Sequence, residues 1–337
     1  MNAPAAVRAV VVAWGRSDGL AACLDAIDAS CAAAGAVVET VVVLAPGDVA
    51  GARVAERPGV RVIVPAAGEP HTPGANRNRG AAGASAPALA FVDGDARLDA
   101  AFVGAALARL AAAPALGGVG GRIRERQWQD GRLVRTIEDS YRSGTGGPVE
   151  MLATAWIARR SAFESVGGFD PRLPAEEDVE LCIRLAAAGH PVEALDRVAA
   201  DHDCPPRPSL AEFRRRWRSG LYAGQGLLLR HSWGTPHFAR HLARQRLYLG
   251  ALAFAALGAA LVLGVLLALP RVARGELSLV ALLFLFVSWA EVAALVVLAM
   301  AVRKRNLGHG ALAVATWVVL GFGIVRAWIL GPRREGS

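Results

Sequence analysis

The chain has 337 residues, of which 54% are hydrophobic, 20% are charged and only 6% are aromatic. This composition excludes a largely disordered protein, and the aliphatic excess must either fill a core or span a bilayer. The formal net charge is +8, but no zinc-finger, RNP or zipper pattern accompanies the basic residues, so nucleic acid is not expected as a partner.

Four apolar runs in the first part of the chain predict buried strands of a parallel sheet. They cover residues 7–13, 37–44, 60–64 and 89–92. One helix is expected after the turn at 15–19, up to about Ala34, and a second, rich in small residues, over 78–86. Strands that alternate with helices predict a doubly wound α/β sheet, with its ligand site at the carboxyl ends of the strands.

Two carboxylates follow the fourth strand directly, in Asp93-Gly94-Asp95. Their oxygens project from one tight turn, and hard divalent cations prefer oxygen ligands. Asp-Gly-Asp is also an ordinary turn sequence, so both interpretations stay open. A helix predicted over 98–110, with Asp99 as its N-cap, favours the metal, because such a site needs a strand before it and a helix after it.

A second acidic cluster, Glu176-Glu177-Asp178, precedes an amphipathic stretch at 179–188 and is therefore predicted to occupy a helix N-terminus. Carboxylates there complement the helix dipole, which would explain the cluster without any ligand. The preceding segment, 166–171, has two glycines before an aromatic residue and then a turn. We expect this segment to place its backbone close to a ligand or to a neighbouring segment.

The four cysteines, Cys23, Cys31, Cys182 and Cys204, contain no CxxC pair. Their spacing indicates neither a zinc site nor a disulfide framework. Reduced thiols in a cytosolic compartment are expected.

Residues 209–247 form a basic juxtamembrane segment between the α/β part, residues 1–208, and the apolar end of the chain. Within 210–231, apolar residues recur among the arginines at a spacing suited to a helix in the plane of the lipid headgroups. The alternative is a solvated basic face. Membrane lipids are the expected partner.

Three apolar stretches, at about 248–269, 277–302 and 311–330, are each long enough for a helix to cross a bilayer. No signal sequence precedes the α/β part, so it is expected to stay in the cytoplasm. Lysine and arginine resist translocation. The expected cytoplasmic side holds eight arginines between 214 and 246 and three basic residues at 303–305, against Arg271, Arg274, Arg333 and Arg334 outside.

The sequence is therefore predicted to be a multi-pass protein of the cell (inner) membrane with three transmembrane helices. Glu291, near the middle of the second stretch, is costly in lipid and is expected to face protein or an aqueous path.

The order and spacing of these motifs resemble the inverting family 2 glycosyltransferases of the GT-A fold. The resemblance covers most of the first 230 residues and rests on Arg77-Asn78-Arg79-Gly80, on Asp93-Gly94-Asp95 as a DXD motif, on 159–163 leading to 167–170, and on Glu177-Asp178 with 179–181. More narrowly, the segment 206–210, the Arg-rich helix with Gly220 and Gly224, and the three spans resemble the membrane glycosyltransferases of succinoglycan-type exopolysaccharide biosynthesis.

The resemblance implies a role for each matching residue. Asp93 and Asp95 would bind the diphosphate of a nucleotide sugar through Mg²⁺ or Mn²⁺, with His202 completing the metal shell, although an isolated histidine is more often a surface residue. Asp178 would be the general base. The donor site would also include Trp14, Arg77 and Asn78, and the acceptor site Glu177, Gly168, Arg216 and Trp217.

The chemistry of transfer requires such a set. Displacing a nucleoside diphosphate builds negative charge on the leaving phosphate, which a metal and a cation such as Arg77 stabilise. The acceptor hydroxyl must lose its proton to a carboxylate as it attacks the opposite face. Asp178 is expected to take that proton, whereas Glu177 orients the acceptor or caps its helix. Without a covalent intermediate, the anomeric configuration inverts.

The chain departs from the family pattern in three places. The second strand runs into 44–48, so Asp48 is displaced from the usual base-reading position. Trp14 stands where a proline is common; it either stacks on the base or is a core or lid residue. Phe213 replaces the glutamine of a Gln-x-x-Arg-Trp sequence, which favours transfer of one sugar per acceptor.

The expected activity is the metal-dependent transfer of a sugar from a nucleotide-diphosphate donor to a polyprenyl-linked glycan or another glycan acceptor at the cytoplasmic membrane face, for exopolysaccharide or cell-envelope assembly. One alternative is a polyprenyl-phosphate monosaccharide synthase. Another, of a different class, is a catalytically inactive membrane scaffold.

Overall fold

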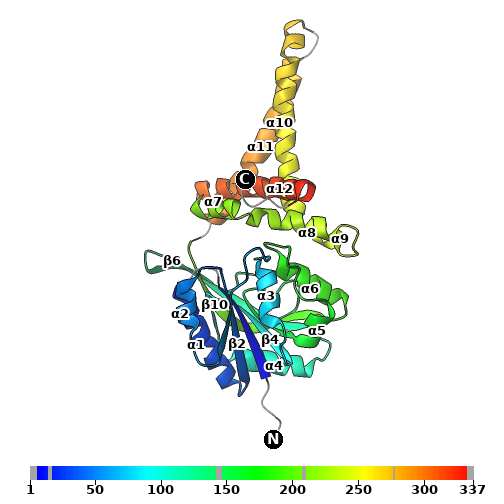
Figure 1. Ribbon diagram of the computed structural model, residues 1–337. Coiled ribbons are helices and arrows are strands. Elements are labelled where there is room, and N and C mark those ends of the chain that lie inside the picture. Colours follow the sequence, from blue (N-terminus) through cyan, green and yellow to red (C-terminus); the bar gives the residue numbers. More distant parts are fainter. Residues whose placement is uncertain (1–5, 14–16, 142–145, 207–209, 276–277, 332–337) are drawn as a thin grey trace. The chain divides into compact units, whose positions relative to one another are not determined.

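The computed structural model describes residues 6–13, 17–141, 146–206, 210–275 and 278–331 (Figure 1). The chain divides into two compact units, Met1–Arg207 and Pro208–Ser337, which we treat separately.

The first unit is built on a ten-stranded mixed sheet. Eight of its strands lie in the order β3-β2-β1-β4-β9-β6-β10-β5, while β7 pairs with β6 and β8 with β10. Its first four strands are parallel and confirm the predicted α/β sheet: β1 (Ala6–Ala13), β2 (Val37–Leu44), β3 (Val60–Ile63) and β4 (Ala88–Asp93). The rest of the sheet was not foreseen: β5 (Ala96–Leu98), β6 (Gly118–Gln129), β7 (Arg132–Ile137), β8 (Gly147–Val149), β9 (Ala155–Arg159) and β10 (Val192–Cys204). Because β9 runs antiparallel to β4, the sheet continues beyond its parallel half.

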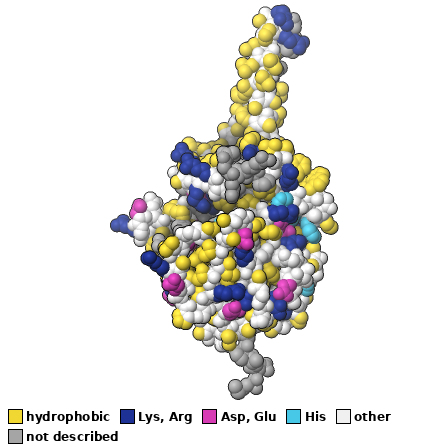
Figure 2. Space-filling model, viewed as in Figure 1, with side chains coloured by type: hydrophobic (Ala, Val, Ile, Leu, Met, Phe, Trp, Pro, Cys, Tyr) yellow, Lys and Arg dark blue, Asp and Glu magenta, His cyan; other side chains and the backbone are white. Residues whose placement is uncertain are grey.

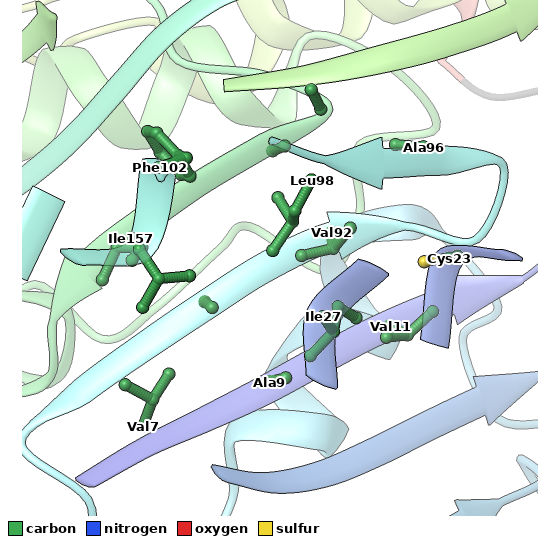
Figure 3. Close-up of a cluster of buried hydrophobic side chains, with 14 of the residues drawn as sticks. Val7, Ala9, Val11, Cys23, Ile27, Val92, Ala96, Leu98, Phe102 and Ile157 are labelled. Atoms are coloured by element: carbon green, nitrogen blue, oxygen red, sulfur yellow. The ribbon is translucent and has the colours of Figure 1, made fainter. Parts of the chain in front are cut away.

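Helices cover both faces of this sheet (Figure 1). On one face, hydrophobic side chains such as Val11, Ile27 and Phe102 form a buried cluster (Figure 3). On the other, the rings of Phe91 and Phe169 lie 5.1 Å apart, centre to centre. The helices of the unit are α1 (Ser17–Ala33), α2 (Val49–Ala55), α3 (Pro73–Ala81), α4 (Phe102–Ala112), α5 (Arg160–Ser165) and α6 (Glu177–Ala187).

Two helices begin elsewhere than predicted. Helix α3 starts about a turn early, because Thr72 accepts a hydrogen bond from Ala75 N as an N-cap and Pro73 takes the first helical position. Helix α4 starts late, because the chain first forms β5 against β10. Asp99 accepts a hydrogen bond from Ala101 N but is not the N-cap.

The second unit opens with α7 (Leu210–Arg218), the 3₁₀ turn η1 (Leu221–Ala223), α8 (Gly224–Ser232) and α9 (Phe238–Arg244). The single helix expected over 210–231 is therefore wrong in extent. The chain breaks at Gly220, whose φ of 72° lies in the left-handed region that ends helices.

Three helices of the second unit are long and apolar enough to cross a membrane: α10 (Arg246–Ala273), α11 (Leu279–Lys304) and α12 (Leu307–Leu330). Hydrophobic side chains cover much of the visible surface of α10 and α11 in Figure 2. Within it, the Trp289 indole donates a hydrogen bond to the Phe254 carbonyl, 2.9 Å away. Glu291 is exposed on this single chain, and the expectation that it faces protein or an aqueous path stays a prediction.

Candidate active site

The site is organised around Arg77, a buried residue of α3 that is 5% exposed. Its Nη1 lies 2.6 Å from Glu177 Oε1 and 3.3 Å from Asp178 Oδ1, and its Nη2 lies 2.8 Å from Asp93 Oδ1. One guanidinium thus joins carboxylates from the end of β4 and from the start of α6. These groups are more than 80 residues apart in the chain, and the fold brings them together.

Helix α3 reaches this position because it packs closely on β1. A Cβ at Gly80 would lie 2.3 Å from Val10 Cγ1, so only glycine permits this approach. At the other end of the helix, Thr72 Oγ1 donates a hydrogen bond to the Pro171 carbonyl, 2.8 Å away. Both contacts fix the helix whose middle carries Arg77.

The second acidic cluster lies at a helix N-terminus, as predicted. Glu176 is the N-cap of α6 in a left-handed conformation, with φ of 69°, and its side chain makes no capping hydrogen bond. Glu177 and Asp178 instead turn toward Arg77. Helix capping alone therefore does not explain the cluster.

Asp178 has unusual electrostatic surroundings for a carboxyl group. Burial raises the pKa of its carboxyl well above the ordinary value, and the charges of Glu177 and Asp93 raise it further, whereas Arg77 opposes the rise. Burial opposes ionisation of Arg77, but the charges of Asp178, Asp93 and Glu177 raise its pKa, so it stays a cation. A carboxylate with a raised pKa is a better proton acceptor near neutral pH.

Asn78 ties α3 to the segment that precedes α6. Its side chain donates to the Phe169 carbonyl and accepts from Phe169 N, both at 2.9 Å. Gly168 has φ of 72°, and a Cβ there would lie 2.6 Å from Asn78 Oδ1. The glycine pair thus places its backbone against a neighbouring segment. Phe169 in turn lies beneath Arg77, with the guanidinium 5.3 Å from the ring centre.

Asp95 and His202 meet at the neighbouring sheet edge, where β5 pairs with β10. His202 Nε2 lies 3.4 Å from Asp95 Oδ1. The histidine is a strand residue with a 14% exposed side chain, not a surface loop residue. Asp93, the other carboxylate of the DXD motif, contacts Arg77, and its role as a metal ligand stays a prediction.

The structure adds two residues to this corner that the sequence did not indicate, Glu125 on β6 and Cys204 on β10. Ligand atoms of Glu125, His202 and Cys204 lie within 4.8 Å of one another. Cysteine spacing alone predicted no such role for Cys204. Glu125 became a candidate only because β6 and β10 pair in register, with Glu125 opposite His202.

This donor set fits a divalent cation. Asp95 and Glu125 each lie beside His202. Carboxylate oxygens with an imidazole nitrogen suit Mn²⁺, and oxygen ligands also suit Mg²⁺. The ion pairs Arg124–Asp201, at 2.6 Å, and Arg126–Asp203, at 2.9 Å, hold the two strands together on either side of His202.

Four other predicted site features stand as follows. Trp14 lies outside the described residues. Arg216 and Trp217 belong to α7 in the second unit, where Arg216 Nε donates to Glu212 Oε1 at 2.7 Å, and their acceptor role stays a prediction. Asp48 caps α2 by accepting a hydrogen bond from Gly51 N, which explains its position without a nucleotide base.

Comparison with known proteins places the chain in a family. The family model described as "Glycosyl transferase family group 2" matches residues 90–302. No match was found among curated proteins at the significance required.

Solved structures share the fold. Mannosyltransferase PcManGT from Pyrobaculum calidifontis, solved with GDP-Man and Mn²⁺, is 19% identical with a TM-score of 0.58, and the match covers 96% of this chain and 86% of that one. S. aureus TarS 1-349, solved with UDP, is 15% identical with a TM-score of 0.50, over 70% of this chain and 68% of that one. At such identities the likeness concerns the fold alone. The family model, by contrast, spans more than half of the sequence and includes both acidic motifs of the site, so the chain belongs to glycosyl transferase family group 2.

Proposed function

We propose that the protein is an inverting glycosyltransferase that moves a sugar from a nucleotide-diphosphate donor to a lipid-linked or other glycan acceptor at the cytoplasmic face of the inner membrane. The family supports the reaction class, and the apolar helices support the membrane. The observation that carries the proposal is the contact of Arg77 with Asp93, Glu177 and Asp178, because it brings a donor-site carboxylate and a candidate base to one point.

Asp178 acts as the general base in this proposal. Its side chain is 15% exposed and lies 3.3 Å from Arg77, whereas that of Glu177 is 8% exposed and lies 2.6 Å from the same cation. Glu177 is therefore the more buried and more tightly paired carboxylate. Asp178 takes the proton from the acceptor hydroxyl as that oxygen attacks the anomeric carbon from the face opposite the leaving diphosphate. One displacement without a covalent intermediate inverts the configuration.

Arg77 acts as a positioning residue. It bridges Asp178 and Asp93, so it holds the base at a fixed distance from the donor side of the site. It also offsets part of the repulsion between carboxylates that would otherwise lie close together in a buried place. A further role on the leaving phosphate stays a prediction.

Asp95, His202 and Glu125 are the residues that would hold a divalent cation. The chemistry that a cation held by these residues would supply is neutralisation of charge on the leaving diphosphate. PcManGT was solved with Mn²⁺, so Mn²⁺ is the first cation to test here.

Replacing the base tests the proposal. Asp178→Asn removes the proton acceptor while keeping the size of the side chain, so transfer should fall by about 10²–10⁴-fold while the donor still binds. The matched control is Glu164→Gln, an exposed carboxylate paired with Arg160 on α5, which should transfer normally. Full activity of Asp178→Asn would remove the base assignment, and NMR of the product shows whether the anomeric configuration inverts.

A polyprenyl-phosphate monosaccharide synthase would use the same donor site with a bare lipid phosphate as acceptor. Offering the purified protein polyprenyl phosphate or a lipid-linked saccharide separates the two activities. Transfer to polyprenyl phosphate alone would replace the proposed acceptor.

An inactive scaffold would keep the fold without turnover. Donor hydrolysis that requires Mn²⁺ and is lost in Asp95→Ala would exclude it, because a scaffold has no need for this carboxylate. If no donor is consumed under any metal, the scaffold is the better account.

A further inference from the structure

We propose that α10 and α11 cross the membrane as a hairpin, whereas α12 lies along the membrane face at which α10 begins and places its apolar side in that leaflet. The chain would then cross twice rather than three times, and α12 would be a lipid-binding surface instead of a span. The argument uses contacts within the second unit.

Contacts between α10 and α11 show which of their residues lie at the same level along the hairpin. A Cβ at Gly258 of α10 would lie 2.1 Å from the Trp289 ring of α11, so these two residues stand at one level. The helices run in opposite directions, so the first turns of α10, near Tyr248, lie at the level of the last turns of α11, near Ala301. Both belong to the end of the hairpin from which the chain enters the membrane.

Helix α12 stays at this end as it proceeds. A Cβ at Gly310 would lie 2.5 Å from Ala301 N, and a Cβ at Gly321 would lie 2.3 Å from the Tyr248 carbonyl. Between the two glycines the helix advances about 16 Å along its axis. A helix that ran back through the membrane alongside α11 would by then reach the middle of the hairpin, near Glu291. Instead, α12 runs across the base of the hairpin, as Figure 1 shows.

The last turn of α12 contacts residues that precede α10 in the chain. Arg230 Nη1 donates to the carbonyls of Trp328 and Ile329, both at 2.9 Å, and so caps the helix C-terminus. The rings of Trp233 and Trp328 lie 5.5 Å apart, centre to centre. A Cβ at Gly226 would lie 2.3 Å from the Ile324 carbonyl.

These contacts determine the side of the membrane. Between α8 and α10 the one helix is α9, whose seven residues are far too short to cross a bilayer. Residues 226–233 therefore lie on the side where α10 begins. Because α12 starts beside the end of α11 and ends beside α8, it starts and ends on that same side.

The basic residues of the chain support this topology independently. With three spans, Arg333 and Arg334 would lie on the outer side, together with Arg271 and Arg274 of the loop between α10 and α11. With two spans, Arg333 and Arg334 lie on the same side as the basic juxtamembrane residues. The bias of lysine and arginine toward the cytoplasmic side becomes stronger.

The exposed side of α12 carries apolar side chains that suit the hydrocarbon of a leaflet. Phe322, Ile329 and Leu330 are 51%, 60% and 68% exposed, whereas Gly321, Gly323 and Ile324 are buried against the other helices of the unit. A helix satisfies its own peptide groups, so it can lie in the plane of a leaflet without unpaired polar groups.

Cysteine labelling with a membrane-impermeant maleimide tests the topology in the full chain. The native cysteines are buried. Three single additions serve as markers: Ser337→Cys after α12, Val49→Cys on the first unit, where the valine is 62% exposed, and Ala273→Cys at the exposed end of α10. We expect Ser337→Cys to label from the same side as Val49→Cys and at least tenfold less from the side of Ala273→Cys. Labelling of Ser337→Cys together with Ala273→Cys, or of all three from one side, would overturn the proposal.

Depth measurement tests the same proposal without relying on the chain end. A fluorophore is attached at Leu307→Cys, Phe322→Cys or Leu295→Cys, all of which replace exposed residues, and quenched by lipids labelled at known depths. An in-plane α12 predicts similar, shallow depths for Leu307→Cys and Phe322→Cys, with Leu295→Cys deeper. A spanning α12 would place Phe322→Cys near the bilayer centre, beside Leu295→Cys, and would contradict the proposal.

Discussion

Two adjacent carboxylates, Glu177 and Asp178, have different surroundings although both contact Arg77. Burial and neighbouring negative charges raise the pKa of Asp178 more than Arg77 lowers it. The environment therefore separates the roles of the two acids more clearly than the sequence does. The shift has consequences for both activity and stability, because proton binding links them.

Activity should rise with pH through the raised pKa of Asp178, because the base works only when it is ionised. The acidic limb of the kcat/KM profile is expected above the ordinary carboxyl range of about 4. Kinetics with saturating Mn²⁺ at each pH would measure it. A limb at an ordinary aspartate pKa would argue against Asp178 as the base.

Stability should change in the opposite sense. The folded state binds a proton at Asp178 more readily than the unfolded state does, so ionisation costs stability as pH rises from about 4 through the raised value. Asp178→Asn removes this cost, and its Tm should exceed that of the wild type at neutral pH, with the difference vanishing in acid. A variant that is less stable at neutral pH would show that the pairing with Arg77 outweighs the burial of the charge.

Gly168 and Gly167 provide a matched pair at the same scale. Both have positive φ, of 72° and 78°, but an added Cβ meets Asn78 only at Gly168. Gly167→Ala should cost about 1 kcal/mol for its backbone conformation. Gly168→Ala should cost about 1–2 kcal/mol more, because it disrupts two hydrogen bonds between Asn78 and Phe169. Equal losses of unfolding free energy for the two variants would contradict this contact.

At the scale of elements, the site depends on how α3 and α6 meet the sheet. The Glu-Glu-Asp cluster, read as the start of a helix, was placed correctly, because an amphipathic repeat follows it. Helix α3 was misplaced, because its start is set by Thr72 and Pro73 and not by its run of small residues. The shift leaves Arg77 in the middle of the helix, where its side chain reaches both acidic motifs.

The pairing of α10 with α11 includes one close approach, at Gly258. The Trp289 ring occupies the space that a side chain at Gly258 would need, whereas Gly264 has nothing within 4 Å. Gly258→Val should destabilise the hairpin by about 1–3 kcal/mol through overpacking. Gly264→Val is the matched control. Thermal unfolding of the full chain in lipid nanodiscs would compare them, and equal Tm values would show that this contact contributes little.

At the scale of the whole molecule, ligand binding should be visible as stability. A nucleotide that binds only the folded chain at 100 times its Kd stabilises by about 2.7 kcal/mol. UDP and GDP, each with Mn²⁺ or with EDTA, form a simple panel that also reports the preferred base. We expect a rise in Tm that requires Mn²⁺ and is lost in Asp95→Ala. A shift of the same size in EDTA would mean that the diphosphate binds without the metal.

The sequence by itself determined the features that depend on local pattern and length. The strand Val37–Leu44 was predicted to the residue, because its apolar second half indicates a strand buried within a covered sheet. The three long apolar helices were also evident, because each apolar run reaches the length of about 20 residues that a span requires. The acidic motifs were found by type and order.

Only the tertiary structure decided which distant residues meet. It joined Asp93 to Asp178 through Arg77, placed Glu125 beside His202 through strand register, and brought the end of α12 to Arg230. The physical reason is that hydropathy and periodicity act over a few turns of chain, whereas ion pairs, strand pairing and helix capping join groups whose separation in the sequence carries no signal.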